Sequence, residues 1–121
     1  MILVDSSIWI RHFRHPDPRL QALVEYQLLL LHPFVLGELA CGKLSQRPAT
    51  IAYLRRLARA SIVPEESLHQ LLNSRRLWDK GLGWIDLHLL ASVLVDHSRL
   101  WTADAALSAA ARTCGVEYPP L

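Results

Sequence analysis

A chain of 121 residues has the length of a single domain, and such a domain buries about two-thirds of the surface that its unfolded chain exposes. Apolar residues make up 51% of the chain and charged residues 20%, which excludes disordered, collagen-like and low-complexity proteins. The formal net charge of +2 is too small for a protein that coats duplex nucleic acid through its overall positive charge, so any basic binding site must be local.

The sequence shows no sign of an oxidising or a membrane environment. Cys41 and Cys114 form no CxxC or Cys/His spacing, so neither a disulfide framework nor a zinc site is predicted. The first residues lack a cationic segment and reach Asp5 after a short apolar run, which is unlike a secretory signal peptide. No apolar run approaches the ~18 residues of a membrane span. We therefore expect a cytoplasmic protein with no membrane partner.

The first half of the chain alternates strands with helices. The apolar run 2–4 predicts a buried strand, and the polar residues 5–7 suit the start of a helix. Helices are expected over 7–14 and 19–26, because the prolines between them end the first helix. Residues 28–31 are apolar on both faces, as a central parallel strand must be, and Pro33 suits the first turn of the next helix.

The second half continues the alternation. A cationic helix is predicted over 49–59 and a short strand over 61–63. A helix that begins at two glutamates is expected over 65–80 and ends before a glycine pair. Apolar residues at every fourth position predict a helix over 85–95. A strand over 99–102, a helix over 105–112 and a last strand over 116–118 complete the pattern.

Alternating strands and helices predict an α/β fold, because parallel strands need crossover connections that lie on the faces of the sheet. We expect a parallel sheet of about five strands flanked by helices on both faces. No internal repeat or linker interrupts the chain, so residues 1–121 are predicted to form one domain.

Four carboxylates stand in apolar segments: Asp5, Glu38, Asp86 and Asp104. Asp5 and Asp104 follow strands, and ligands of open parallel sheets bind beyond the carboxyl ends of the strands. Asp86 lies in the first turn of its predicted helix and borders the core side. Taken singly, Asp5, Asp86 and Asp104 are also explained as helix caps. Glu38 lies in mid-helix, where a cap is no explanation.

Several buried carboxylates repel one another unless they take up protons or a cation. Within four positions of these acids the only basic side chain is His88, so a divalent cation is the natural counter-charge. Ligation by oxygen alone favours Mg²⁺ or Mn²⁺ over zinc. The four acids together therefore predict a metal site.

Four segments carry a resemblance to a known family. They are Met1–Ile10 with Asp5, Leu36–Leu39 with Glu38, Gly83–Asp86, and Leu100–Asp104. In this order they resemble the PIN-domain ribonucleases, and specifically the VapC-type toxins of prokaryotic toxin-antitoxin pairs. The resemblance spans nearly the whole chain, and nothing at the four acidic positions departs from the family's pattern.

The resemblance implies an endonuclease that hydrolyses RNA with Mg²⁺ or Mn²⁺ and leaves 5′-phosphate and 3′-hydroxyl ends. Its catalytic and metal-binding residues fall on Asp5, Glu38, Asp86 and Asp104, with Asp5 and Asp104 as the principal ligands. Thr102 and Ser6 are the supporting hydroxyl neighbours. The resemblance also implies a homodimer and a VapB-like antitoxin that blocks the cleft, with a cation near the carboxylates.

Basic side chains that contact the RNA backbone are expected near the four acids. Lys43, Arg47 and Lys80 lie just beyond the segments that carry Glu38 and Asp86, which makes them candidates for phosphate contacts. Three arginines at 55, 56 and 59 lie on one helix face and are interpreted as solvated surface. The four tryptophans are expected to pack in the core, although those at 9, 78 and 84 could line an apolar surface.

Three other functions are considered on the sequence alone. A receiver-like phosphoacceptor domain also has acids at strand ends, but it needs a second acid beside Asp5, where this chain has Ser6 and Ser7. A haloacid-dehalogenase-type phosphatase needs an aspartate at position 7, which is a serine. A PIN-fold RNA- or protein-binding module without activity is the third possibility.

Overall fold

The computed structural model describes residues 1–119 and has a sheet of four parallel strands in the order β3-β2-β1-β4. The strands are short: β1 (Ile2–Val4), β2 (Leu29–Leu31), β3 (Ala58–Arg59) and β4 (Arg99–Trp101). β1 lies in the centre, with Leu3 paired to Leu30 on one side and to Leu100 on the other. The predicted parallel sheet is therefore confirmed.

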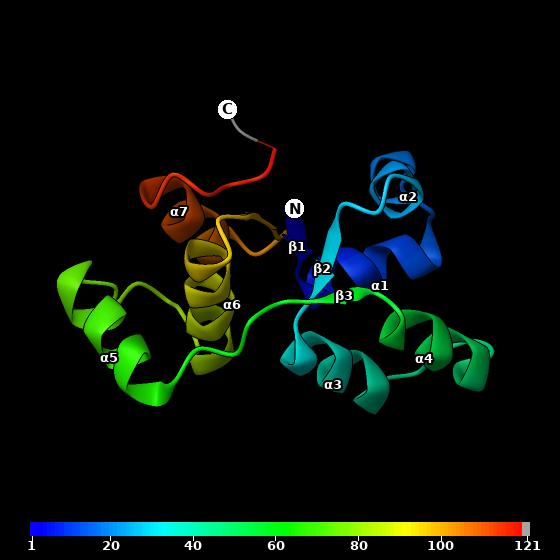
Figure 1. The fold of residues 1–121 in the computed structure, drawn as a ribbon, viewed down its shortest axis with the longest axis horizontal. Helices are drawn as coiled ribbons and strands as arrows, with labels where there is room; N and C mark the ends of the chain where they lie inside the picture. Colours follow the sequence, from blue (N-terminus) through cyan, green and yellow to red (C-terminus); the bar gives the residue numbers. More distant parts are fainter. Residues whose placement is uncertain (120–121) are drawn as a thin grey trace.

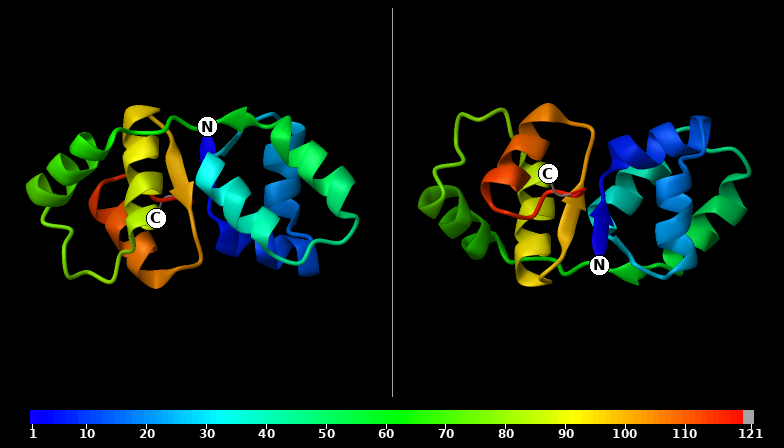
Figure 2. Two further views of the ribbon diagram at one scale, coloured as in Figure 1. Left: turned by 90° about the horizontal axis from the view of Figure 1, so that it is seen from below. Right: turned by 90° about the horizontal axis from the view of Figure 1, so that it is seen from above.

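Residues 1–119 contain six helices between the strands and one after the last strand: α1 (Ser6–Arg14), α2 (Pro18–Glu25), α3 (Pro33–Cys41), α4 (Arg47–Arg55), α5 (Glu65–Ser74), α6 (Trp84–Val95) and, after β4, α7 (Ala105–Thr113). Figure 1 shows α1 to α4 on one side of the sheet and α5 to α7 on the other, and the views in Figure 2 agree. The predicted α/β fold with helices on both faces is confirmed.

The hydrophobic core lies on both faces of the two central strands. Leu3, Val4, Leu31 and Leu100 are fully buried, which explains why these strands are apolar at consecutive positions rather than alternating. Trp9 of α1 is also buried in the core.

The predicted strand over 61–63 is wrong. The third strand is β3, at residues that the sequence pattern assigned to the end of a helix, because α4 already ends at Arg55. The backbone N–H of Ser61 donates to a carboxylate oxygen of Asp96 (2.9 Å), and the Ser92 hydroxyl donates to the Ser61 carbonyl. These contacts with the far end of α6 and the residue after it replace pairing in the sheet.

The helix predicted over 65–80 is also shorter in the structure, where α5 ends at Ser74. Arg76 (φ 52°), Asp79 (φ 58°) and Gly81 (φ 81°) have left-handed backbone conformations, which a helix does not contain. The segment 75–83 is consequently a sequence of turns that leads into α6.

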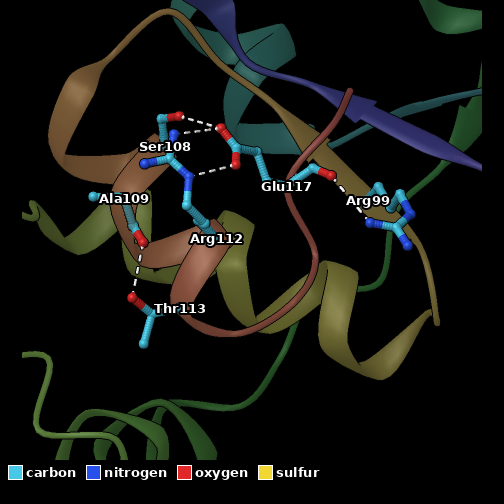
Figure 3. A network of polar contacts seen from close by, with 6 residues as sticks. All are labelled: Arg99, Ser108, Ala109, Arg112, Thr113 and Glu117. Atoms are coloured by element: carbon cyan, nitrogen blue, oxygen red, sulfur yellow. Dashed lines mark hydrogen bonds and ion pairs between the residues drawn. The ribbon is translucent and has the colours of Figure 1, made fainter. Parts of the chain in front are cut away.

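The fifth predicted strand, at 116–118, is reduced to one parallel bridge between Leu100 and Glu117. Figure 3 shows what holds this segment against α7. The Glu117 carboxylate accepts hydrogen bonds from Arg112 Nε (2.8 Å) and from the Ser108 hydroxyl (2.8 Å), and its carbonyl accepts one from Arg99 (3.1 Å). Two backbone hydrogen bonds, from Leu100 N–H to the Val116 carbonyl (2.7 Å) and from Tyr118 N–H to the Leu100 carbonyl (2.9 Å), hold the same segment against β4.

Among residues 1–119, no helix has the length and apolar character that crossing a membrane requires.

Candidate active site

The order of the strands places a switch point between β1 and β4. From β1 the chain crosses to β2 on one side, whereas β4 lies on the other side. Open parallel sheets bind their ligands at such a point, beyond the carboxyl ends of the strands. Asp5 follows β1 at this point, and its backbone N–H donates to the carbonyl of Trp101, the last residue of β4 (3.0 Å).

Asp5 is a buried carboxylate with a full set of hydrogen-bond donors. It is the N-cap residue of α1, and Oδ1 accepts from the backbone N–H of Ser6 at 2.6 Å. Oδ2 accepts from the Ser7 hydroxyl at 3.0 Å and from the Thr102 hydroxyl at 2.7 Å. These donors fix the orientation of the Asp5 carboxylate.

Thr102 joins the ends of the two strands. Its hydroxyl donates to Asp5 and accepts from the backbone N–H of Asp104 (3.0 Å). Asp104 is the N-cap residue of α7, and its Oδ1 accepts from the backbone N–H of Leu107 at 2.9 Å. The predicted neighbours Asp5, Thr102 and Asp104 are thus brought together by direct contacts.

Ser7 is a residue that the sequence analysis did not single out. Its hydroxyl donates to Asp5 and accepts from the backbone N–H of Ala103 at 3.1 Å, so it ties the start of α1 to the loop after β4. Ser6, which was singled out, donates more weakly through its hydroxyl, at 3.3 Å from Asp5 Oδ1. Both serines were considered as parts of a helix cap, and the pairing with the distant loop has no signal in the sequence.

Asp86 lies in the first turn of α6. Its Oδ2 accepts from the backbone N–H of Gly83 at 2.9 Å, which holds the side chain across the start of the helix. The pKa of Asp86 is raised, mainly by burial. The hydrogen bond from Gly83 lowers this pKa, whereas the charges of Asp104 and Asp5 raise it further. Asp86 therefore lies within the electrostatic reach of both strand-end carboxylates.

Glu38 approaches the same point from α3, which packs against α1. Burial raises the pKa of Glu38, and the charge of Asp5 adds to this rise. A contact with the Ser6 hydroxyl lowers the pKa, and Asp86 contributes a further, smaller rise. Glu38, Asp5, Asp86 and Asp104, from four separate segments, thus lie within electrostatic reach of one another.

The four carboxylates are not paired with cations in the part of the chain that the structure describes, although Arg14 and Lys43 line the same cavity as Glu38. Within residues 1–119 none of the four carboxylates forms an ion pair with Lys, Arg or His. Over the same residues, no three acidic, histidine or cysteine side chains converge closely enough to enclose an ion by themselves. An all-oxygen set of this kind suits a hard cation that keeps part of its water shell.

The three predicted RNA-binding cations have different surroundings. Lys43 and Glu38 line one cavity of about 500 Å³. Arg47 donates to the carbonyls of Gly42 (3.3 Å) and Ala40 at the end of α3, so its guanidinium is engaged by the fold. Lys80 is exposed in the segment before α6.

A sequence model of the PIN domain family matches residues 2–113, and the chain belongs to this family. Relatives include Ribonuclease VapC32 of Mycobacterium tuberculosis, from strains CDC 1551 / Oshkosh and ATCC 25618 / H37Rv. Each is 44% identical over 117 residues, which cover 96% of this chain and 94% of the relative. The resemblance to VapC-type PIN proteins is therefore confirmed, and the receiver-like and phosphatase alternatives are set aside.

Proposed function

We propose that the chain is the toxin of a toxin-antitoxin pair and acts as a metal-dependent endoribonuclease that hydrolyses phosphodiester bonds of RNA. The observation that carries this proposal is the group of four carboxylates from separate segments beside the switch point between β1 and β4, with no cation paired to any of them within residues 1–119. The name of the relatives, ribonuclease, agrees with it. In this proposal, residues 1–121 form one PIN domain, and the protein acts in the cytoplasm.

The proposed metal ion is Mg²⁺ or Mn²⁺, with Asp5 and Asp104 as its principal ligands and Glu38 and Asp86 binding directly or through water. Oxygen donors without Cys or His suit these ions. A bound divalent cation supplies positive charge that activates water and stabilises the charge that develops on the phosphate.

The protein's own residues supply the positioning. Thr102 and Ser7 hold the Asp5 carboxylate from two directions, so that it needs no reorganisation when substrate binds. Gly83 holds Asp86 in the same way through its backbone N–H. Lys43, exposed beside Glu38, is placed to meet the RNA backbone, and the charge on the four acids disfavours bare RNA without the metal.

The partner proposed for the toxin is a VapB-like antitoxin. The cavity of about 500 Å³ extends from Glu38 along α1 and α3 and is lined by Ile10 and Phe13, which are exposed apolar side chains. An apolar antitoxin segment fits this lining, and an arginine at its end would pair with the unneutralised carboxylates. We also propose that the toxin forms a homodimer, as the family resemblance implies.

Metal binding at the shared site is tested by thermal unfolding with Mn²⁺. A ligand at 100 times its Kd stabilises the folded state by about 2.7 kcal/mol, which is readily measured. We expect a rise in Tm for the wild type and for Glu66→Gln, a control that removes an exposed acid of α5. Asp5→Asn should show no rise, and equal rises in all three proteins would contradict a shared site.

The activity is tested with a labelled single-stranded RNA. Cleavage that needs the metal and is lost in Asp104→Asn supports the proposal, because asparagine still caps α7 while the ligand charge is removed. A folded wild type that binds metal but cuts no RNA would favour the binding-module alternative.

A further inference from the structure

Two of the four tryptophans are exposed, against the expectation that all pack in the core. Trp9 and Trp101 are buried, whereas Trp78 is 53% exposed and Trp84 is 45% exposed. Exposed indoles are costly to hydrate, and two close together mark a surface that binds something.

Trp84 is the first residue of α6 and lies two positions before Asp86. Its ring is supported by edge contacts with His88 (5.3 Å between centroids, 90°) and by His69 of α5 (5.4 Å, 44°). The indole is therefore held by rings on two helices while nearly half of the residue's surface stays open to solvent. The preceding residue, Gly83, is the one whose N–H binds Asp86, so Trp84 adjoins the candidate active site directly.

Trp78 is presented by the turns of the segment 75–83. Leu77 is buried and anchors the segment, and its backbone N–H donates to the Leu72 carbonyl (3.0 Å). Trp78, Gly83 and Trp84 line one concavity of about 200 Å³, which we call the Trp78–Trp84 cleft. This volume is below the ~300 Å³ at which pockets for drug-sized ligands begin, so it suits one ring system.

The segment that carries Trp78 is mainly basic, although the charged residue that lines the cleft is Asp79. Arg75, Arg76 and Lys80 are exposed, and none of them forms an ion pair within the part of the chain that the structure describes. Asp79, which also lines the cleft, is the only acid between positions 75 and 80. Aromatic surface flanked by unpaired cations is the combination with which proteins bind single-stranded nucleic acid.

We propose that the Trp78–Trp84 cleft takes up one unstacked base of single-stranded RNA next to the phosphodiester that is cut, and so selects the cleavage position. The inference rests on the proposed function and adds to it residues that read the substrate. Trp84 is the primary stacking surface, Trp78 is the opposite wall, and Lys80 meets a flanking phosphate.

A second copy of the chain is the other occupant to consider, since exposed apolar residues also form dimer interfaces. The centres of protein interfaces are depleted of charged side chains, and three exposed cations, Arg75, Arg76 and Lys80, lie in the same short segment as Trp78. Continuity with the candidate active site through Gly83 also favours RNA.

The test measures RNA binding by fluorescence anisotropy with Mg²⁺ present, in an Asp104→Asn background so that the RNA stays intact. The probe is a labelled 12-nucleotide single-stranded RNA of mixed sequence, compared with an abasic strand of equal length. Trp84→Ala should weaken binding of the RNA about 5- to 150-fold, the range for loss of one stacked base, and leave binding of the abasic strand unchanged. Trp84→Phe should retain most of the affinity.

Matched variants separate stacking from charge and from folding. Tyr26→Ala removes an aromatic side chain that is 71% exposed at the end of α2 and should change nothing. Ile85→Ala alters the apolar neighbour of Trp84 without removing a ring and should also keep full affinity. Lys80→Ala should lower the slope of log K against log salt by about 0.7, whereas Trp84→Ala should leave this slope unchanged.

The inference is overturned if Trp84→Ala binds both strands as the wild-type surface does, or if it weakens both equally. It is also overturned if Trp84→Ala leaves RNA affinity intact and instead dissociates a dimer in analytical ultracentrifugation, which would assign the cleft to a second copy. If the protein with an intact cleft binds no RNA and the wild type cuts none, the proposed function itself is wrong. This outcome differs from the failure of the cleft alone, in which RNA is bound but Trp84 does not contribute.

Discussion

The Thr102 hydroxyl donates a 2.7 Å hydrogen bond to Oδ2 of Asp5 across 97 positions of sequence. It joins the carboxyl ends of β1 and β4, the two strands that flank the switch point of the sheet. The same hydroxyl accepts from the backbone N–H of Asp104, so one side chain orients both proposed principal ligands.

Loss of this hydroxyl is predicted to weaken both stability and activity. Thr102→Val keeps the shape of the side chain but removes a bond to a charged group, which typically contributes about 1.5–3 kcal/mol. Thr102→Ser keeps the hydroxyl and should stay close to the wild type. Urea unfolding and RNA cleavage measure the two effects, and a Val variant as stable and active as the Ser variant would show that Thr102 has no positioning role.

Asp86→Asn is predicted to lower RNA cleavage by roughly 10²–10³-fold, the loss typical when one preorganised electrostatic group is removed. Its stability without metal should be equal to or above that of the wild type. The reason is that burial and the charges of Asp104 and Asp5 disfavour ionised Asp86, while the amide oxygen can still accept from Gly83. Glu66→Gln, at an exposed acid of α5, is the control, and a marked loss of stability in Asp86→Asn would contradict this view of the site.

His32 is predicted to make stability depend on pH in acid. It is fully buried, and its Nδ1 accepts from the backbone N–H of Phe34 at the start of α3. Burial, followed by the proximity of His88, lowers the pKa of His32 to about 4, with Asp96 opposing the shift. The pKa of an unfolded histidine is about 6.5.

The direction of the pH dependence follows from the pKa of His32 in the folded and in the unfolded chain. Above pH ~6.5 the ring is neutral in both states and its contribution is constant; as pH falls toward 4, the unfolded chain takes up the proton more readily and stability decreases. The loss of stability is about 3 kcal/mol at most once the pH has fallen to about 4, since each pH unit between the two pKa values costs about 1.4 kcal/mol. In urea unfolding from pH 7.5 to 4.5, His32→Asn should show a flatter dependence, because asparagine caps a helix but does not titrate. Equal slopes would exclude His32 as the cause.

Lys43 and Arg47, both predicted from the sequence as RNA contacts, are expected to behave differently. Lys43→Ala should lower the salt dependence of RNA binding by about 0.7 in slope, the value for one lost phosphate contact with a single strand. Arg47→Ala should mainly lower stability, since Arg47 caps the end of α3 through the carbonyls of Gly42 and Ala40. A lower salt dependence in Arg47→Ala, with unchanged stability, would mean that the Arg47 guanidinium leaves the carbonyls of α3 when RNA binds.

The order of the elements was predictable because it depends on local patterns. The apolar runs that became β1 and β2 are buried on both faces, and such runs are readable without the fold. The short edge strand β3 at Ala58–Arg59 was missed because both residues are exposed and carry no apolar signal. A strand was predicted at 61–63 because Ile62 and Val63 are β-branched. Hydrogen bonds to α6 and to Asp96 instead hold Ser61 out of the sheet.

The candidate site was predictable as a set of residue types and not as a geometry. Asp5 and Asp104 were marked by their position after strands, and Glu38 by an acid in mid-helix with no cap to form. The bridge through Ser7 and the exposure of Trp84 depend on which segments meet in space, for which periodicity has no signal.

We propose that the four carboxylates Asp5, Glu38, Asp86 and Asp104 form one metal-dependent site that cuts RNA. The most direct measurement incubates antitoxin-free protein with total cellular RNA in Mg²⁺, Mn²⁺ or chelator and maps the new 5′ ends for the wild type and Asp86→Asn. We predict discrete cuts that require metal and disappear in Asp86→Asn. Cuts that persist in chelator or in Asp86→Asn, or the absence of any cut by a folded, metal-binding wild type, would contradict it.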